Sequence, residues 1–139
     1  MENIAWKEEY NVGCESVDLA HKKIFSVIRK VDQLVNYNEY ERDKFACIEA
    51  IKFLREYTIT HFMQEEAFMK ELGYQGYDKH KEIHDALREK TLPHLIKELE
   101  RTEFSRESVK KFLATFIAWL SGHILIEDRA ITGRAKRRR

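Results

Sequence analysis

Apolar side chains recur at intervals of three and four residues through most of this 139-residue chain, and that period is typical of helices that bury one face. Period-2 alternation, the pattern of half-buried strands, is weak throughout. Turn-forming residues are scarce, with 5 glycines and 1 proline. We therefore predict an all-α fold of four helices, over residues 17–36, 42–72, 78–101 and 106–129.

Connections this short favour antiparallel neighbours, so we expect an up-down-up-down four-helix bundle. Ser16 and Ser105 are the expected N-caps of the first and fourth helices, and Gly73 is expected to end the second. Pro93 lies inside the third helix and is expected to kink or break it, because its ring clashes with the preceding turn. The second helix is predicted to bury one face, made of Cys47, Ile51, Leu54, His61, Glu65, Phe68 and Leu72.

A chain of this length suggests one domain with one sizeable core. We expect residues 1–15 to form an N-terminal arm anchored by Trp6 and Tyr10, residues 16–130 to form the bundle, and residues 131–139 to form a basic tail. The net charge is +1, and five positive charges lie in the last part of the chain, at Arg134, Lys136, Arg137, Arg138 and Arg139. The tail is expected to be solvated rather than to bind nucleic acid, because no basic helix face accompanies it.

Several classes of protein are disfavoured. The start, MENIAWKEEY, carries acids and no apolar run, so no secretory signal is expected. The longest apolar run, FLATFIAWL, has nine residues, whereas a helix needs about 20 to cross a bilayer. Cys14 and Cys47 are too few for a disulfide framework, and Cys47 falls on a core face. The expectation is a cytoplasmic protein without a membrane partner.

Seven polar side chains fall on faces that the apolar pattern assigns to the core. In the predicted topology, the start of the first helix, the end of the second, the start of the third and the end of the fourth meet at one end of the bundle. The seven lie at these four helix ends: His21, His61, Glu65, His80, His84, His123 and Asp128. The remaining histidine, His94, lies off this face of the third helix and is expected at the surface.

Burying seven such groups in one layer requires compensation. Each unpartnered group costs a few kcal/mol, whereas a whole domain is stable by only ~5–15 kcal/mol. Metal ions compensate directly, and imidazole with carboxylate suits iron, zinc, copper or nickel. The lack of thiolates at the site argues against a zinc finger or an iron–sulfur cluster. Five histidines exceed what one tetrahedral zinc takes, so the set predicts two metal ions side by side.

One pair does not fit ideal helix geometry. His123 and Asp128 are five residues apart, which separates them by roughly 140° around a helix of 3.6 residues per turn. They share a face only if the helix contains a π-turn or frays at its end. We therefore expect an irregularity between them.

The order of these residues resembles the hemerythrin family, in particular its bacterial members. The resemblance rests on the pattern H…HxxxE…HxxxH…HxxxxD and on an upstream arm W-xxx-Y-x-V-G, and it covers residues 6 to about 129. The matching residues are Trp6, Tyr10, Val12, Gly13, Asp18, His21, His61, Glu65, His80, His84, His123 and Asp128.

The resemblance implies two non-heme iron ions. One would be bound by His80, His84 and His123, and the other by His21 and His61. Glu65 and Asp128 would bridge them, together with an oxo or hydroxo bridge from solvent. Counted this way, the first iron has six ligands and the second has five, which leaves one open position.

The implied function is reversible binding of dioxygen, as peroxide, at the open position, for storage, delivery or sensing and without enzymatic turnover. Such binding needs a dry pocket. Four residues within a turn of a ligand resemble the family's pocket positions: Ile24, Phe62, Trp119 and Ile126. The chain departs from many relatives at Ala20, Pro93 and Glu127, which bears on oxygen affinity and autoxidation rather than on the ligands.

Two other functions remain as alternatives. A di-iron enzyme would consume oxygen, peroxide or nitric oxide and turn over with an electron donor. A redox or oxygen sensor would act on a separate protein partner. Ferritin-like di-iron oxygenases use Glu-x-x-His pairs with more carboxylate than imidazole, so the histidine-rich set here favours binding over catalysis. The sequence leaves the oligomeric state open.

Overall fold

The computed structural model describes residues 5–37 and 39–135. Within these ranges every regular element is helical. A 3-10 turn, η1 (Glu8–Tyr10), precedes the long helices α1 (Glu15–Asn36) and α2 (Tyr40–Leu72). The third rod consists of α3 (Tyr77–Ala86), the π-helical turn η2 (Leu87–Thr91) and α4 (Leu92–Arg101). The fourth consists of α5 (Arg106–His123) and the π-helical turn η3 (Ile124–Asp128).

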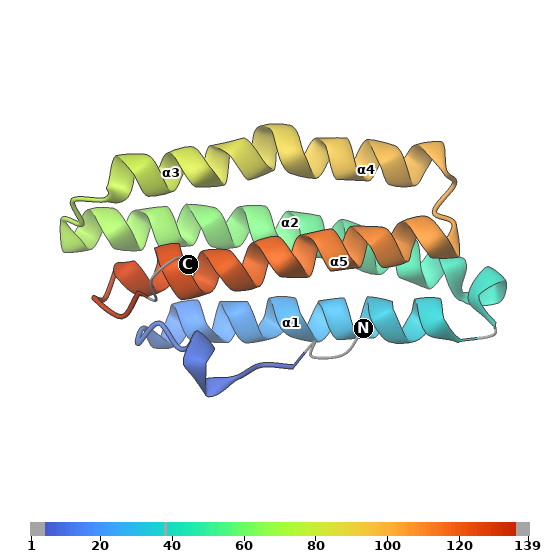
Figure 1. Ribbon diagram of the computed structural model, residues 1–139, viewed down its shortest axis with the longest axis horizontal. Helices are drawn as coiled ribbons and strands as arrows, with labels where there is room; N and C mark the ends of the chain where they lie inside the picture. Colours follow the sequence, from blue (N-terminus) through green and yellow to red (C-terminus); the bar gives the residue numbers. More distant parts are fainter. Residues whose placement is uncertain (1–4, 38, 136–139) are drawn as a thin grey trace.

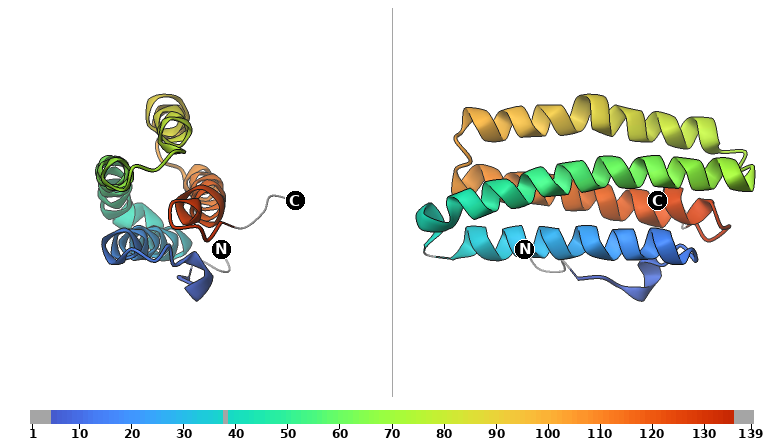
Figure 2. Two further views of the ribbon diagram at one scale, coloured as in Figure 1. Left: turned by 90° about the vertical axis from the view of Figure 1, so that its left-hand side faces the viewer. Right: turned by 180° about the vertical axis from the view of Figure 1, so that it is seen from behind.

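The four rods lie side by side and alternate in direction (Figure 1), and the end-on view in Figure 2 places them around a common core. This arrangement confirms the predicted all-α four-helix bundle. The start of α1, the end of α2, the start of α3 and the end of α5 lie at the same end of the molecule, on the left of Figure 1. The arm that contains η1 lies against α1 near this end.

Two of the predicted helix boundaries are confirmed. Ser105 is the N-cap of α5, and its Oγ accepts a hydrogen bond from the Ser108 N–H at 3.2 Å, which satisfies one of the free donors of the first turn. Gly73 ends α2 in the left-handed conformation, with φ of 64°, where the lack of a Cβ removes the steric cost.

The predicted start of the first helix is wrong. Helix α1 begins at Glu15, with Cys14 at the N-cap position, so Ser16 lies inside the first turn. The carboxylate of Asp18 accepts hydrogen bonds from the backbone N–H groups of Val12 at 2.7 Å and Gly13 at 3.2 Å. A side chain inside the helix thus holds the incoming arm, a role that residue-by-residue capping preferences do not reveal.

Pro93 does not break the third rod. The chain stays helical from residue 77 to residue 101, and the misfit is taken up by η2, in which the Leu92 N–H donates to the Leu87 carbonyl five residues earlier. Wider turns of this kind accommodate a residue that cannot join the regular hydrogen-bond ladder. The third rod therefore contains a π-turn, η2, immediately before the segment that holds Pro93.

The core confirms most of the predicted buried face of α2. Cys47, Ile51 and Leu54 are buried, and Phe68 is partly buried. Leu72 is instead 54% exposed, because it lies in the last turn of α2, and Met69 occupies the buried position. In the arm, Tyr10 and Trp6 pack their rings on Phe25 at centroid distances of 5.1 and 5.7 Å, which confirms them as anchors.

Among the described residues, one helical segment, Arg106–Asp128, is long and apolar enough to cross a membrane by length and composition alone. Its apolar face is part of the protein core, with Val109, Phe112, Phe116 and Leu120 buried against the other helices. Core helices of soluble bundles have this composition, and the segment fits that role here.

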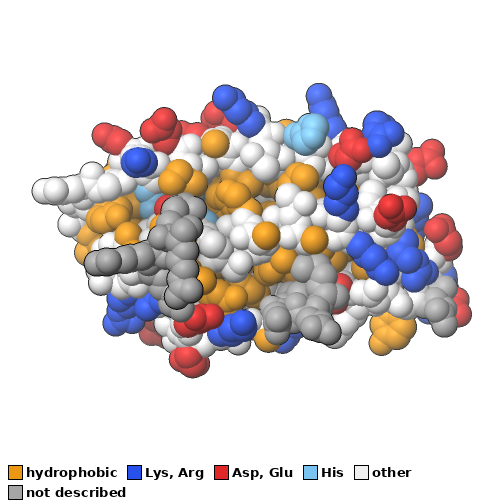
Figure 3. All heavy atoms as spheres, viewed as in Figure 1, with side chains coloured by type: hydrophobic (Ala, Val, Ile, Leu, Met, Phe, Trp, Pro, Cys, Tyr) orange, Lys and Arg blue, Asp and Glu red, His pale blue; other side chains and the backbone are white. Residues whose placement is uncertain are grey.

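The surface carries charges of both signs. On the face drawn in Figure 3, Lys and Arg side chains are interspersed with Asp and Glu, in keeping with the net charge of +1. Of the basic tail, residues 136–139 lie outside the described ranges.

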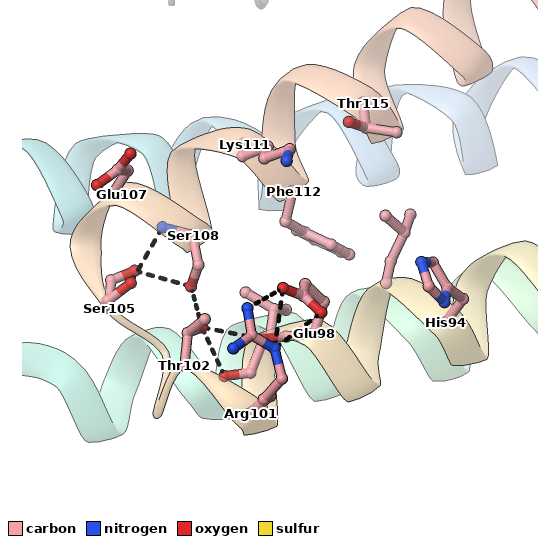
Figure 4. A pocket seen from close by; sticks show the side chains of 12 residues that line it. His94, Glu98, Arg101, Thr102, Ser105, Glu107, Ser108, Lys111, Phe112 and Thr115 are labelled. Atoms are coloured by element: carbon pink, nitrogen blue, oxygen red, sulfur yellow. Dashed lines mark hydrogen bonds and ion pairs between the residues drawn. The ribbon is translucent and has the colours of Figure 1, made fainter.

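A surface hollow of about 580 Å³ lies between α4 and the start of α5 (Figure 4). It is at the other end of the bundle from the start of α1 (Figure 1). Its polar lining is largely self-paired, since the Thr102 hydroxyl donates to Ser108 Oγ at 2.7 Å and Arg101 pairs with Glu98. His94 lines the rim and is exposed, as predicted.

Candidate metal centre

All seven polar residues that the sequence places at one end of the core are buried there. They come from the start of α1, the end of α2, the start of α3 and the end of α5 with η3. Their side chains are fully or almost fully removed from solvent: His21, His61, Glu65, His80, His84, His123 and Asp128. The bundle therefore brings together every predicted ligand.

The seven side chains form two overlapping groups, each with its ligand atoms within 4.8 Å of one another. One group contains three histidines and the other contains two. The larger group is Glu65, His80, His84, His123 and Asp128, and the smaller is His21, His61, Glu65 and Asp128. The two carboxylates belong to both groups, which is the arrangement that two adjacent ions sharing carboxylate bridges require.

The two oxygens of Asp128 point to different groups. Its Oδ1 lies 3.0 Å from both His80 Nε2 and His123 Nε2, which belong to the larger group. Its Oδ2 lies 3.1 Å from His21 Nε2, in the smaller group. One carboxylate can thus offer one oxygen to each of two ions.

Glu65 divides in the same way. Its Oε1 lies 3.0 Å from His80 Nε2 and 3.1 Å from His84 Nε2. Its Oε2 lies 3.8 Å from His61 Nε2, on the side of the smaller group. The separations of 3.0 and 3.1 Å suit metal ligation, because two ligands about 2.1 Å from one ion and 90° apart are roughly 3.0 Å from each other.

In the larger group, the Nε2 atoms of His84 and His123 point toward each other. His84 Nδ1 donates to Glu66 Oε2 at 2.8 Å, and His123 Nδ1 contacts Glu127 Oε1 at 3.2 Å. With Nδ1 protonated, each neutral ring carries a lone pair on Nε2, yet these two Nε2 atoms are 3.1 Å apart. Either a proton or a cation must stand between them.

The smaller group also requires a proton or a cation, because several of its buried atoms have no hydrogen-bond partner among the described residues. Both ring nitrogens of His21, His61 Nε2, Glu65 Oε2 and Asp128 Oδ1 are buried without one. His21 Nε2 and Asp128 Oδ1 each lie within 3.1 Å of an opposite group, but at angles that are not those of hydrogen bonds, and His61 Nε2 is 3.8 Å from Glu65 Oε2. Converging lone pairs without donors are what a metal ion satisfies, so these residues fit a pair of bound ions.

Without metal, bound protons satisfy some of these lone pairs. Burial alone lowers the pKa of His80 and His123, but the facing carboxylates outweigh it and raise these pKa values to about 9 and about 10. Burial and the neighbouring His21 lower the pKa of His61 to about 4. Burial raises the pKa of Asp128, but the charge of His123 and the close contacts with the other facing histidines hold it well below its usual value.

The π-turn η3 explains how His123 and Asp128 reach the same site. In η3 the Arg129 N–H donates to the Ile124 carbonyl five residues earlier, which adds a residue to the turn and rotates Asp128 onto the face of His123. The irregularity expected between these two residues is therefore present, as a π-turn.

Two carboxylates that contact candidate ligands were not predicted from the sequence to do so. Glu66 follows a predicted ligand directly, and Glu127 precedes one. Each contacts the outer ring nitrogen of a histidine, His84 and His123 respectively. Such contacts fix the tautomer and raise the basicity of a ligating imidazole. The available signal was an acid adjacent in sequence to a buried carboxylate.

The four predicted pocket residues differ in their placement. Phe62 is buried and stacks on His84 at a ring-centroid distance of 3.9 Å. Trp119 is half-buried and stacks on His123 at 4.6 Å. Ile24 is buried in the core, whereas Ile126 is half-buried on η3. Two aromatic rings thus cover the larger group on the side toward the bundle core.

Comparison with known proteins agrees with this centre. The family model described as "Hemerythrin HHE cation binding domain" matches residues 12–135. A bacteriohemerythrin of Clostridium acetobutylicum is 32% identical over 125 residues, which cover 89% of this chain and 95% of that protein. A bacteriohemerythrin of Pseudomonas aeruginosa is 28% identical over 128 residues, which cover 92% of this chain and 78% of that protein.

A myohemerythrin of Theromyzon tessulatum is 33% identical over 79 residues, which cover 57% of this chain and 58% of that protein. No solved structure gave a significant match. Because the family model spans most of the chain and all seven candidate metal ligands, the chain belongs to the hemerythrin family, whose members hold a pair of iron ions and bind dioxygen.

Proposed function

We propose that this protein binds dioxygen reversibly at a pair of non-heme iron ions, for oxygen storage, delivery or sensing. The observation that carries the proposal is the unequal pair of groups, with three and two histidines, that share both carboxylates. When bound, two ferrous ions supply the electrons that hold dioxygen and recover them on its release. The protein's part is to hold the ions, to leave one position open and to keep water away.

The ligand roles follow from the two groups. His80, His84 and His123 would hold one iron, and His21 and His61 the other. Glu65 and Asp128 would bind both ions, since each directs its two oxygens to different groups. The ion held by fewer histidines, His21 and His61, would then have a position left for dioxygen.

Apolar side chains would keep that position dry. Phe62 lies between the two groups, because its ring stacks on His84 and lies 6.3 Å from that of His61. Trp119 stacks on His123, Ile24 lies in the adjoining core, and Ile126 lies on η3. Because water and protons promote loss of bound oxygen and leave ferric iron, these side chains are proposed to limit autoxidation.

The histidine-rich ligand set supports binding rather than catalytic turnover. Carboxylate-rich di-iron sites stabilise highly oxidised iron, whereas five imidazoles and two carboxylates make a milder centre. An enzyme or a sensor would share the same centre, so the test must distinguish release of unchanged oxygen from its consumption.

The test is an optical titration. The anaerobic, ferrous protein is exposed to oxygen, and the oxygen is then removed under vacuum or argon. A visible absorption band that grows with oxygen and disappears on its removal, over repeated cycles, supports the proposal. A single, lasting change to a ferric spectrum contradicts it and favours an enzyme or a redox sensor.

Phe62→Ala tests the apolar wall. The substitution is expected to lower the free energy of unfolding by about 3–5 kcal/mol, as for other buried phenylalanines, and to speed autoxidation by admitting water beside His84. Thermal or urea unfolding and the rate of loss of the oxygen-dependent band measure the two effects.

Phe45→Ala is the matched control, since Phe45 is on the same helix but 74% exposed, and its removal should change stability by no more than about 0.5 kcal/mol. Equal autoxidation rates in Phe62→Ala and Phe45→Ala would rule out Phe62 as part of the wall.

A further inference from the structure

A chain of charged contacts leads from a candidate ligand to the protein surface. His84 Nδ1 donates to Glu66 Oε2 at 2.8 Å, and the Arg88 guanidinium donates to the same oxygen at 2.7 Å. Arg88 Nε also donates to Asp85 Oδ1 at 3.0 Å, and Lys81 Nζ donates to Asp85 Oδ2 at 2.9 Å. The outer end of the chain is in water, and the inner end is a fully buried imidazole.

Arg88 is the cationic partner of a nearly buried carboxylate in this series of contacts. Glu66 is only 8% exposed, so its charge depends on a partner within the protein. Arg88 is that cationic partner, and its guanidinium carbon also lies 5.9 Å from the ring centre of Phe62, which stacks on His84. Arg88 thus contacts two of the groups that pack against the His84 ring, Glu66 and Phe62.

The two candidate metal groups differ in this support. Two histidines of the larger group, His84 and His123, each have a carboxylate on Nδ1. In the smaller group, His21 Nδ1 is buried without a partner among the described residues. The Glu66–Arg88 pair therefore supports a histidine of the larger group, and the described residues give His21 in the smaller group no equivalent.

We propose that Arg88 is a positioning residue of the metal centre: it keeps Glu66 on His84 Nδ1 and so leaves His84 Nε2 as a lone pair directed at the metal. This inference rests on the proposed function. Without Arg88, the nearly buried carboxylate of Glu66 is more stable when it turns toward water, because a buried charge without a partner is costly. The His84 ring then loses the contact that fixes its orientation and tautomer.

The test compares three variants with the wild-type chain. Arg88→Met removes the charge and keeps an apolar stem over Phe62, whereas Arg88→Lys restores a charge. Arg101→Met is the matched control, since Arg101 also pairs with an acid three residues earlier on the same rod, Glu98, but lies away from the ligands. Co²⁺ is titrated into each metal-free protein, and NMR records the exchangeable ring N–H signals of the Co²⁺-loaded form.

Arg88→Met is expected to weaken Co²⁺ binding about tenfold, the lower end of the range for residues that support a ligand, and to lose one ring N–H signal to solvent exchange. Arg88→Lys should recover most of the affinity, and Arg101→Met should match the wild type.

Wild-type affinity and an unchanged N–H spectrum in Arg88→Met would overturn the role of Arg88. An equal loss of affinity in Arg101→Met would also overturn it, by assigning the effect to surface charge. In either case, reversible oxygen binding by the wild-type chain still decides the proposed function separately. If Arg88→Met does not fold, Asp85→Asn, which weakens the hold on Arg88, must lower Co²⁺ affinity for the proposal to stand.

Discussion

Glu65→Ala is expected to abolish binding of the iron pair and to have a free energy of unfolding about 3–5 kcal/mol below that of the iron-loaded wild type. Glu65 is fully buried, and its two oxygens face the histidines of different groups. Its loss removes a ligand from both ions and leaves buried imidazoles without a charge partner. Iron content per chain and the melting temperature measure the two consequences.

Two further variants make this result specific. Glu65→Gln keeps the shape of the side chain but not its charge, so it should fold without metal and still hold fewer than two irons per chain. Glu49→Ala, at an exposed site of the same helix, should keep both irons and change stability by no more than about 0.5 kcal/mol. Two irons and an unchanged melting temperature in Glu65→Ala would disprove the assignment of Glu65.

Removal of metal should destabilise the wild-type chain by a comparable amount. A ligand that binds only the folded state stabilises it by about 4 kcal/mol when its free concentration is a thousand times Kd. For a chain of 139 residues that corresponds to a fall in melting temperature of roughly 10–20 °C on chelation. Calorimetry of the loaded and chelated proteins, at equal pH and salt, gives the difference.

The physical reason is the set of buried atoms that only a cation or protons can satisfy, which includes His21 Nδ1, His61 Nε2 and Glu65 Oε2. Refilling the chelated protein should restore the original melting temperature. A chelated protein that melts at the same temperature as the loaded one would mean that the seven residues are satisfied without metal, against our account.

Much of this architecture was predictable, because the helical period of apolar residues and the free-energy cost of burying polar groups can both be judged from neighbouring residues in the sequence. The helical period of α5 and the cap at Ser105 set that helix without reference to distant residues. The metal-ligand candidates followed from a conflict within the same pattern, since histidines and carboxylates such as His61 and Glu65 occupy positions that the period assigns to the core. The expected irregularity between His123 and Asp128 came from the same geometry.

What escaped prediction depends on contacts between distant segments. The start of α1 depends on Asp18 reaching the arm, and the effect of Pro93 depends on a π-turn that the packed bundle accommodates. Glu66 and Arg88 are ordinary polar residues in the sequence, and their role follows only from which nitrogen of His84 faces outward. Contacts of this kind, around a candidate ligand, leave no periodic pattern in the sequence.

The most direct test of the central claim is a crystal structure of the iron-loaded protein with anomalous diffraction at the iron edge. We predict two irons per chain, one bound by His80, His84 and His123, and one by His21 and His61. Glu65 and Asp128 should contact both ions. One iron, or two irons that share neither carboxylate, would contradict the account.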